Sequence, residues 1–582
     1  MFRSQRIKID KTIQTITLII GVLAFISIFA QLGFYLPSSA QIFLDKFVDQ
    51  TIASIFVLLV TFKFFLTPSK IDYIKENPVE TFLGTSFVLI VLLYQIFNYS
   101  SAHYILSAKL TNTLIKVYFI FTQFYIIFNT FLTFIRSQEK GFFFTLHPAR
   151  IFAFSFLFVI IAGACLLKLP KATLIPISWI DSLFMATSSV CVTGLATVTI
   201  ADVFTIQGQL IIIFLMQVGG LGMITLTAVI TLFIQRGFHL RDQFVLGEIL
   251  DDSHLSSITQ MLKNIIKITF FFEFIGIVLL YFFWNDTGLS EFNRIFNAVF
   301  HGISAYCNAG LSNLPQGLQT PGYSTFAPPL IVIMILIVAG GIGFYTITDI
   351  INPHKKSFPK GQRLKLQTRI VLFSYIILIF IGAFFIWLLQ RAQWSDLSLG
   401  QQFMNSLFTS VASRTAGFSI VEVGTMLIPP LMIVIFLMYI GGAPNSTAGG
   451  IKVTTAVTLL VSMWGFIKGK ERIELARRTI PMLLIRRAFI ILVSSIILIF
   501  SALFLLSLTE KHAYFDLFFE TVSAFGTVGL SRGITPFLSE WGKLIIILVM
   551  YIGRIGMFTL ALIVTEKITT HNYRFPDTTL MI

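Results

Sequence analysis

Charged residues are scarce in this chain. They make up 12% of its 582 residues, whereas about a quarter of the residues of a soluble domain are charged. Hydrophobic residues make up 56%. This composition excludes a string of soluble domains and predicts an all-α membrane protein with many spans. The 42 basic residues outnumber the 27 acidic ones, but they lie between the apolar stretches, as in cytoplasmic loops. We therefore expect contact with membrane lipid and none with nucleic acid.

Several kinds of chemical site are also missing from the sequence. The three cysteines have spacings that fit neither a disulfide framework nor a metal site. The eight histidines form no catalytic cluster, and there is no G-x-x-x-x-G-K-[ST] sequence for a nucleotide. An enzyme and a covalently bound cofactor are therefore not expected. The basic segment 1–11 leads into an apolar stretch without a cleavage site, which argues against a removed signal peptide.

Long apolar stretches predict twelve membrane spans, because about 20 residues cross the hydrocarbon of a bilayer. Basic residues cluster in alternate loops, most densely at 354–369 and 468–487, which places both termini in the cytoplasm. We thus expect a multi-pass protein of the plasma (inner) membrane. The expected spans are 13–37, 51–67, 81–98, 115–135, 150–168, 207–234, 264–285, 327–350, 370–390, 427–464, 487–508 and 540–565.

A short pattern that ends in glycine recurs in this sequence. Gly194, Gly310, Gly417 and Gly529 each follow a run of mostly small residues and precede an apolar residue. A short amphipathic segment comes before each glycine, at 179–190, 292–305, 402–412 and 514–524. Irregular backbone at membrane depth is tolerated only where protein buries it or where it lines a wet cavity. Half-spanning helices with outward-facing loops around one axis therefore predict a cation pore lined by backbone carbonyls.

A second glycine signature follows each of these loops. It contains the pairs Gly219-Gly220, Gly340-Gly341, Gly441-Gly442 and Gly553-Arg554. We interpret each pair as lying inside the span that leaves the loop. Glycines at such positions commonly let helices approach closely, but four in matched register favour descent from an internal repeat.

The residues that carry a family resemblance lie in the second half of the chain. They are Gly441–Lys452 (GGAPNSTAGGIK), Ser413–Phe418 (SRTAGF) and Ser523–Ser531 (SAFGTVGLS). With them, the chain resembles the Trk/Ktr/HKT superfamily of potassium uptake proteins over about residues 145–567. The resemblance implies four membrane–pore–membrane repeats around a pseudo-fourfold axis. The expected domains are an extension at 1–144 and repeats at 145–245, 246–360, 361–470 and 471–582.

The resemblance also implies partners and an ion. Members of the superfamily form homodimers in which each protomer has its own pore, and a cytosolic nucleotide-binding ring controls opening. The nucleotide is then expected on that partner, not on this chain. Some sodium-carrying members have serine at the position of Gly194, so glycine there favours potassium. Cys191 and Cys307 depart from the family pattern; we interpret both as small residues packed behind their loops.

The expected selectivity filter is formed by backbone carbonyls that replace the water around potassium. Glycine at the last position of each loop keeps side chains out of the ion path. The expected filter residues are Val190, Cys191, Val192, Thr193 and Gly194; Tyr306, Cys307, Asn308, Ala309 and Gly310; Ser413, Arg414, Thr415, Ala416 and Gly417; and Phe525, Gly526, Thr527, Val528 and Gly529.

The expected gate interrupts the stretch 427–464, which is too long for one plain helix. Its residues are Gly441, Gly442, Ala443, Pro444, Asn445, Ser446, Thr447, Ala448, Gly449 and Gly450, with Lys452 as a weaker candidate. Arg554 is a charged residue deep in a span, and such residues are usually functional. We expect Arg554 to contact carbonyls of 441–450 below the filter and to place an electrostatic barrier in the ion path. Arg414 is expected to brace its loop.

Other interpretations remain open for the sequence. A twelve-span secondary transporter of another solute would have two repeated halves with a midplane site, and a sodium-permeable cation carrier would keep the same fold. The four apparent spans before residue 145 are not required by the family. They contain no arginine ladder for voltage sensing, so we expect a packing role or support of a dimer.

Overall fold

The computed structural model describes residues 2–86 without 68, 77 and 78; 118–130 without 120, 124, 128 and 129; and 148–221, 258–285, 290–323, 327–351, 364–557, 559 and 560. Most of the expected spans 81–98 and 115–135 lies outside these residues, as do the ends of 207–234 and 540–565 and most of the loop 354–369. The chain divides into two compact units, Met1–Thr145 with two short later segments and nearly all of the remainder.

The N-terminal unit is helical where it is described. It contains α1 (Phe2–Gly33), α2 (Ser38–Phe43), a π-helical turn (Leu44–Val48), α3 (Asp49–Leu66) and α4 (Lys70–Glu76). Asp49 is buried and accepts hydrogen bonds from Ser27 (2.7 Å), Gln31 (2.8 Å) and Gln123 (2.5 Å). These donors supply the partners that a buried carboxylate requires, so a polar network joins segments of this unit that are far apart in sequence.

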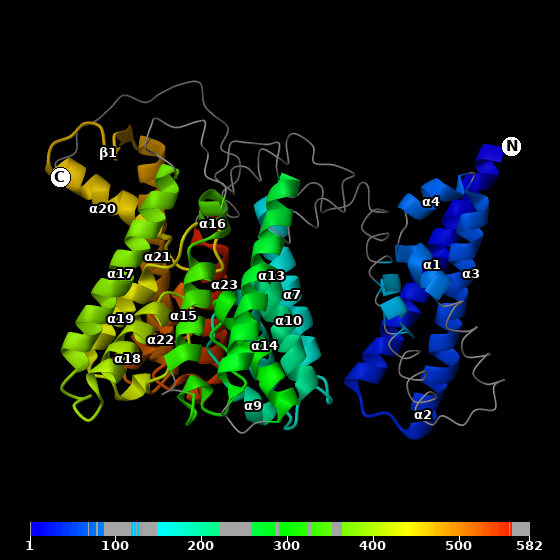
Figure 1. Cartoon of the computed structure of the whole chain (residues 1–582), viewed down its shortest axis with the longest axis horizontal. Coiled ribbons are helices and arrows are strands. Elements are labelled where there is room, and N and C mark those ends of the chain that lie inside the picture. Colours follow the sequence, from blue (N-terminus) through cyan, green and yellow to red (C-terminus); the bar gives the residue numbers. More distant parts are fainter. Residues whose placement is uncertain are drawn as a thin grey trace. The chain divides into compact units, whose positions relative to one another are not determined.

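The second unit repeats one order of helices along the chain (Figure 1). In each repetition a long helix is followed by a short one and then by an inner helix. The groups are α7 (Pro148–Leu167), α8 (Trp179–Cys191) and α10 (Ile206–Gly220); α13 (Ile258–Phe283), α14 (Glu291–Tyr306) and α15 (Ala327–Gly341); α17 (Leu366–Gln390), α18 (Leu399–Ala412) and α19 (Ile428–Tyr439); and α21 (Met482–Thr509), α22 (Tyr514–Gly526) and α23 (Glu540–Ile555). Single turns lie between them at α9 (Ile200–Val203), Gly317–Gln319, Val423–Thr425 and Thr535–Phe537.

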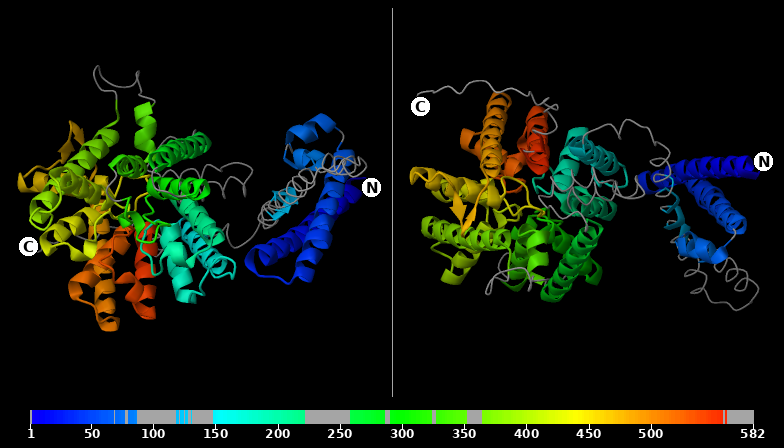
Figure 2. Two further views of the ribbon diagram at one scale, coloured as in Figure 1. Left: turned by 60° about the horizontal axis from the view of Figure 1, so that its bottom comes forward. Right: turned by 90° about the horizontal axis from the view of Figure 1, so that it is seen from above.

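The short helices pack in a closed cyclic order. Each contacts the long and inner helices of its own group and the inner helix of the group before it: α14 contacts α10, α18 contacts α15 and α22 contacts α19. The circle closes because α8 of the first group contacts α23 of the last. Figure 2 shows the groups following one another around a common centre. The chain thus surrounds one central region with segments from all its groups.

Local sequence signals start the short helices. Ser178, Ser290 and Ser398 precede α8, α14 and α18, and each side chain accepts a hydrogen bond from the backbone N–H three residues on. Such caps stabilise a helix start by about 1 kcal/mol. At their other ends, all of these short helices stop at the glycine-bearing loops. Their C-terminal carbonyls therefore direct negative partial charge toward the centre.

Three pairs of the second glycine signature lie in the last turn of the inner helix that leaves the loop, as expected, and only Gly441-Gly442 lies beyond its helix. α10 ends at Gly220, α15 at Gly341 and α23 at Ile555, immediately before Gly556, while α19 ends at Tyr439. Close backbone packing explains why glycine stands at these positions. A β-carbon on Gly219 or Gly553 would lie 2.1 Å from the carbonyl oxygen of Val190 or Phe525, and one on Gly340 would lie 2.0 Å from that of Tyr306.

The expected span 327–350 is sharply bent and is not one straight helix. α15 and α16 (Phe344–Ile351) meet at an angle of 96°. Gly343 between them has φ +84°, a conformation that glycine adopts without steric cost. The helical hydrogen bonds lost at the break are replaced from another group, since Phe344 N–H donates to Asn445 O and Ala443 N–H donates to Gly341 O.

The apolar stretch 427–464 is interrupted where the sequence predicts. α19 ends at Tyr439 and α20 (Val453–Ile467) begins beyond the segment 441–452, and a small hairpin of β1 (Glu474–Leu475) and β2 (Arg478–Thr479) follows. Among the described residues, four helices are long and apolar enough to cross a membrane, and five if the bent pair counts as one span. Several apolar helices therefore indicate a multi-pass membrane protein.

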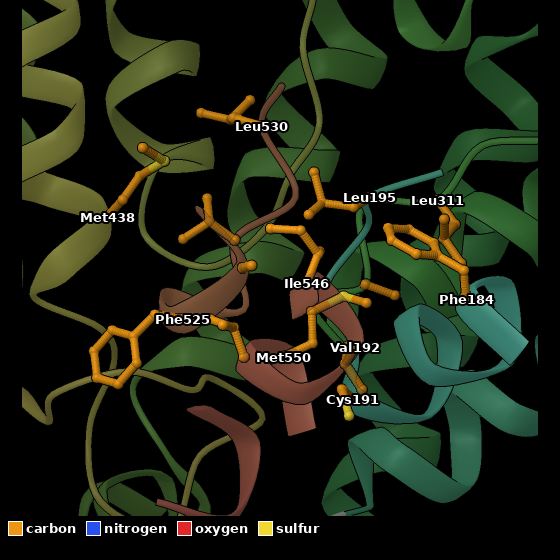
Figure 3. Packing of buried hydrophobic residues seen from close by; sticks show 14 of the residues in the cluster. Phe184, Cys191, Val192, Leu195, Leu311, Met438, Phe525, Leu530, Ile546 and Met550 are labelled. Carbon is orange, nitrogen blue, oxygen red and sulfur yellow. The ribbon is translucent and has the colours of Figure 1, made fainter. Parts of the chain in front are cut away.

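The core of the second unit surrounds the glycine loops. In Figure 3, Val192 at the end of α8 lies near Met550 of α23, and Phe525 of α22 and Met438 of α19 belong to the same cluster. All of these side chains are buried. The first and last groups of the chain therefore share one hydrophobic core, which holds the loops from behind.

The close packing of Gly340 predicts a measurable effect on stability. Gly340→Ala places a β-carbon 2.0 Å from the Tyr306 carbonyl oxygen, and such overpacking costs about 1–3 kcal/mol. We expect a lower thermal unfolding midpoint for the purified variant in detergent. Gly400→Ala in α18 is the control, because no atom lies within 4 Å of its added β-carbon. Equal midpoints for Gly340→Ala and wild type would contradict the close contact.

Candidate functional site

The glycines that end the four loops lie against one another. A β-carbon added to Gly194 would lie 2.6 Å from Ala309 O, and one added to Gly310 would lie 2.4 Å from Ala416 O. Gly417 approaches Val528 O in the same way at 2.4 Å, and Gly529 approaches Thr193 O at 2.1 Å. Each loop thus touches the next, and the last touches the first. This closed ring leaves no room for any side chain at the four positions.

The loops share one backbone conformation. The four glycines have φ of +97°, +65°, +71° and +94°, and the residue two before each glycine also has positive φ. Those residues are Val192, Asn308, Thr415 and Thr527. A β-branched residue at positive φ is strained, and such strain is typical of functional sites. Its recurrence at the same position of every loop indicates that the ring needs this conformation.

The amide groups of the loops face their own short helices. Thr193, Ala309 and Val528 donate their N–H groups to the carbonyl oxygens of Ser188, Ser304 and Ser523 at 2.7–2.8 Å, and Ala416 donates to Ala412 at 3.0 Å. Gly194 and Gly529 donate to the hydroxyls of Ser188 and Ser523. In a trans peptide the carbonyl points opposite to the N–H. The carbonyls of these peptides therefore point away from the helices.

Three of the expected filter residues have carbonyls with another environment. The oxygens of Val190, Tyr306 and Phe525 lie against Gly219, Gly340 and Gly553 of the inner helices. These residues are the last or nearly the last of α8, α14 and α22. The ring of closest approach is therefore formed by the later residues of each loop, up to Gly194, Gly310, Gly417 and Gly529.

The side chains of the expected filter pack behind it. Cys191 and Cys307 are buried free thiols, and Gly220 packs against Cys307. Ser413 caps α18, and its hydroxyl donates to Ser410 O. At the position three residues before the loop glycine, small residues thus stand in every loop except the third, which carries Arg414.

The segment 441–450, called here the gate segment after its expected role, packs against the fourth loop. Gly449 packs against Thr527, and Gly450 against Gly526. Its two ends are paired, because Gly441 N–H donates to Ile451 O at 2.8 Å. The residues between them are irregular, with Asn445 and Gly450 at positive φ, Ser446 bonded to Ala443 O, and Pro444 O against Gly343.

Three cationic side chains bind carbonyls of the gate segment. Arg554 donates to Thr447 O and, at 2.5 Å, to Gly219 O, so the contact expected from sequence is present. Lys452 donates to Ala448 O at 2.5 Å, and Arg414 donates to Gly441 O at 2.8 Å. Neither arginine pairs with a carboxylate among the described residues. Two arginines whose charge no carboxylate among the described residues neutralises thus bind this segment.

Polar pairs brace the outer side of two loops. His301 is fully buried on α14; Nδ1 lies 2.9 Å from Asn297 O and Nε2 lies 2.8 Å from Ser312 Oγ. Since a carbonyl only accepts, Nδ1 of the neutral ring carries the proton, and the Ser312 hydroxyl donates to Nε2. Glu520 has the matching position on α22 and accepts a hydrogen bond from Thr535, which contacts Ser531.

Sequence reasoning missed several buried groups of the site. Glu273 on α13 accepts from Gln217 at 3.2 Å and from the Cys307 thiol at 3.7 Å, behind the second loop. Asp181 at the start of α8 pairs with Lys543 of α23 at 2.7 Å and joins the first and last groups. The available signal was a single acidic residue in an apolar stretch, as at Glu273 and Glu520, because such residues are costly unless they have partners.

Comparison with known proteins agrees with this geometry. The family described as "TrkH: Cation transport protein" matches residues 114–573. The chain belongs to the TrkH family of cation transport proteins. It is 36% identical over 451 residues to the Ktr system potassium uptake protein B of Vibrio alginolyticus, covering 77% of this chain and 96% of that protein. The counterpart from Bacillus subtilis is 34% identical, with 74% and 95% covered.

Two further proteins are similar to this chain over about three quarters of its length. The potassium/sodium uptake protein NtpJ of Enterococcus hirae is 34% identical, with 75% of this chain and 97% of that protein covered. The crystal structure of the potassium transporter TrkH from Vibrio parahaemolyticus has a TM-score of 0.60 at 18% identity and covers 77% of this chain and 91% of that chain. This structural match concerns the fold. Residues 1–113 lie outside the family match.

The His301–Ser312 pair predicts a difference between two serines at matched loop positions. Ser312→Ala leaves a buried ring nitrogen without a donor, which costs about 1–3 kcal/mol. Ser419 follows Gly417 as Ser312 follows Gly310, but its hydroxyl donates to Val421 O within its own loop. We expect Ser312→Ala to lower the unfolding midpoint in detergent more than Ser419→Ala does. The reverse order would contradict the assigned hydrogen bond.

Proposed function

We propose that this chain forms the membrane pore of a potassium uptake system. The observation that carries the proposal is the closed ring of contacts between Gly194, Gly310, Gly417 and Gly529. The names of the relatives, potassium uptake protein B in two bacteria, support potassium as the ion. In this proposal the helix groups are four membrane–pore–membrane repeats around a pseudo-fourfold axis, and the N-terminal helices are an extension of four spans.

The proposed mechanism replaces water by backbone oxygens. Potassium that enters from outside exchanges its hydration shell for carbonyls of the four loops, whose amides are bonded to the short helices. The C-terminal ends of those helices add negative partial charge. A membrane potential of about 100 mV, negative inside, favours entry by about 2.3 kcal/mol per ion. The ligands for potassium are the carbonyls of the loop residues that follow Val190, Tyr306, Ser413 and Phe525. They extend to the loop glycines.

The gate segment closes the inner side of this pore. It lies against Thr527 and Gly526 and is held by Arg554, Lys452 and Arg414. Because no carboxylate among the described residues neutralises the two arginines, the closed state opposes a cation by charge as well as by volume. Opening requires the segment and its hydrogen bonds to move.

The resemblance to the Trk/Ktr/HKT superfamily supports a proposal for the assembly. We propose a homodimer with one pore in each protomer, located in the plasma membrane with cytoplasmic termini. A cytosolic nucleotide-binding ring would control the gate segment from the inner side. The basic, exposed residues around the β1–β2 hairpin, such as Arg472, Arg477 and Arg478, offer a surface for an acidic partner.

Potassium uptake can be tested in cells that lack their own uptake systems. We expect the chain to restore growth at low external potassium, and Gly194→Ser to abolish this, because its β-carbon would lie 2.6 Å from Ala309 O at φ +97°. Gly400→Ala is the control. Sodium uptake by the wild-type chain, or potassium uptake that Gly194→Ser leaves unchanged, would favour the sodium-permeable carrier that the relative NtpJ suggests.

The barrier at Arg554 can be tested by flux. Arg554→Gln keeps a donor for Thr447 O or Gly219 O but removes the charge. A buried positive charge near the ion path opposes a cation by Coulomb repulsion. We expect rubidium flux into proteoliposomes to rise roughly tenfold, about 1.4 kcal/mol of barrier. Lys468→Gln, which removes an exposed charge at the end of α20, is the control; equal flux for Arg554→Gln and wild type would exclude the barrier.

A further inference from the structure

Arg414 occupies a position where the other loops have small residues. Three residues before the loop glycine, the first, second and fourth loops have Cys191, Cys307 and Gly526, and the third has Arg414. All four side chains or backbones are buried at this position. An arginine is a costly substitute for a thiol or a hydrogen in such a place. Its presence in one loop of four therefore requires a specific reason.

The side chain of Arg414 leads from the filter to the gate segment. Arg414 is 0% exposed, and its Nη2 donates to Gly441 O at 2.8 Å. Its guanidinium lies 3.9 Å from the ring centre of Tyr375 on α17, which fixes its plane. Nε and Nη1 are buried without a hydrogen-bond partner among the described residues. The bond to Gly441 is therefore the polar anchor of this side chain.

Gly441 is the point at which the gate segment is tied together. Its N–H donates to Ile451 O at 2.8 Å, and Ile440 and Ile451 pair as neighbouring strands do. A β-carbon on Gly441 would lie 2.0 Å from Gly449 O. The chain thus enters and leaves the segment where Gly441 pairs with Ile451, a contact called here the pinch. Arg414 binds the pinch at the Gly441 carbonyl. The other two cations, Lys452 and Arg554, bind Ala448 and Thr447 nearer the middle of the segment.

We propose that Arg414 is a positioning residue that couples the third filter loop to the pinch of the gate segment. This inference rests on the proposed function and deepens it. Because Arg414 fixes Gly441 to the third filter loop, the residues between 442 and 450 move while Gly441 stays in place. The same hydrogen bond between Arg414 and Gly441 restrains the third loop. It thereby keeps the carbonyls of this loop at the spacing that suits potassium. Arg414 itself does not contact the ion.

The coupling predicts two effects of one substitution. Arg414→Met keeps the length of the side chain but loses the charge and the hydrogen bond. We expect its basal rubidium flux into proteoliposomes to rise severalfold, because the base of the gate segment is released. We also expect the ratio of potassium to sodium uptake to fall at least fivefold, because the third loop loses its tether. Arg414→Lys should recover part of both, since lysine can reach an acceptor but stacks poorly on Tyr375.

Two further variants separate coupling from a general loss of structure. Lys452→Met is the matched control, because Lys452 also donates to a carbonyl of the gate segment but is rooted at the start of α20, not in the filter. It should change flux and leave the potassium-to-sodium ratio within twofold of wild type. Tyr375→Leu removes the stacking surface and should shift both quantities in the direction of Arg414→Met, and Tyr375→Phe should not. These Tyr375 variants carry the test if Arg414→Met fails to fold.

The outcomes distinguish this inference from the proposed function. A wild-type chain without cation uptake in proteoliposomes would overturn the proposed function. A wild-type chain that takes up potassium, with Arg414→Met or Tyr375→Leu raising flux at an unchanged ion ratio, would overturn the coupling, since Arg414 would then act on the gate segment alone. Unchanged flux and ratio in a folded Arg414→Met variant would also overturn it.

Discussion

The contact between four backbones at one point constrains the rest of this structure. Gly194, Gly310, Gly417 and Gly529 each lie so near the next loop that a β-carbon would collide with a carbonyl oxygen or a main-chain atom. The backbone at such a point must have its amide donors satisfied elsewhere, and the short helices supply the acceptors through Ser188, Ser304 and Ser523. The helices therefore have to end at the same depth, and the inner helices need glycine where they meet the helix ends. Both glycine signatures follow from this one packing requirement.

A single polypeptide can break the symmetry that this ring suggests. The matched position on the short helices is occupied by Met185, His301, Phe408 and Glu520, all buried, so two loops are braced by hydrogen bonds and two by apolar contact. Among the described residues, the gate segment between α19 and α20 has no counterpart in the other groups. Arg554 stands in α23 where the other groups have glycine. Where the gate segment crosses the centre, its neighbours adapt, and α15 breaks at Gly341 and Gly343 to exchange hydrogen bonds with Ala443 and Asn445. The gate segment of the third group thus requires the helix break after α15 in the second group.

The sequence allowed prediction of the features that depend on nearby residues. The short helices, the loop glycines and the interruption between Tyr439 and Val453 all have local signals, and the motifs around Gly417 and Gly441 indicated the family that the match over residues 114–573 shows. Features that depend on distant backbone were not predictable. The run at Gly340–Gly343 reads as one apolar span, because its break uses acceptors and donors about 100 residues away in sequence. In the same way, the glycine pairs reveal a need for small residues but not that the crowding atom is a carbonyl of another helix, as at Gly219. The contacts of Glu273 and His301 depend on the packed fold alone.

In the proposed pore, the cations bonded to the gate segment explain how a ring of carbonyls and its closure can coexist. A ring of neutral dipoles attracts a cation without adding net charge, whereas Arg414, Lys452 and Arg554 bring positive charge close to the same region. Each of these cations is bonded to a carbonyl of the gate segment, so the segment's own dipoles offset part of the repulsion while it is in place. If the gate segment moves, the cations lose these acceptors and regain them only from water or from other carbonyls. In the proposed pore, opening is therefore opposed by the loss of hydrogen-bond acceptors for the buried cations as well as by loss of packing. A partner that drives opening would have to supply that free energy.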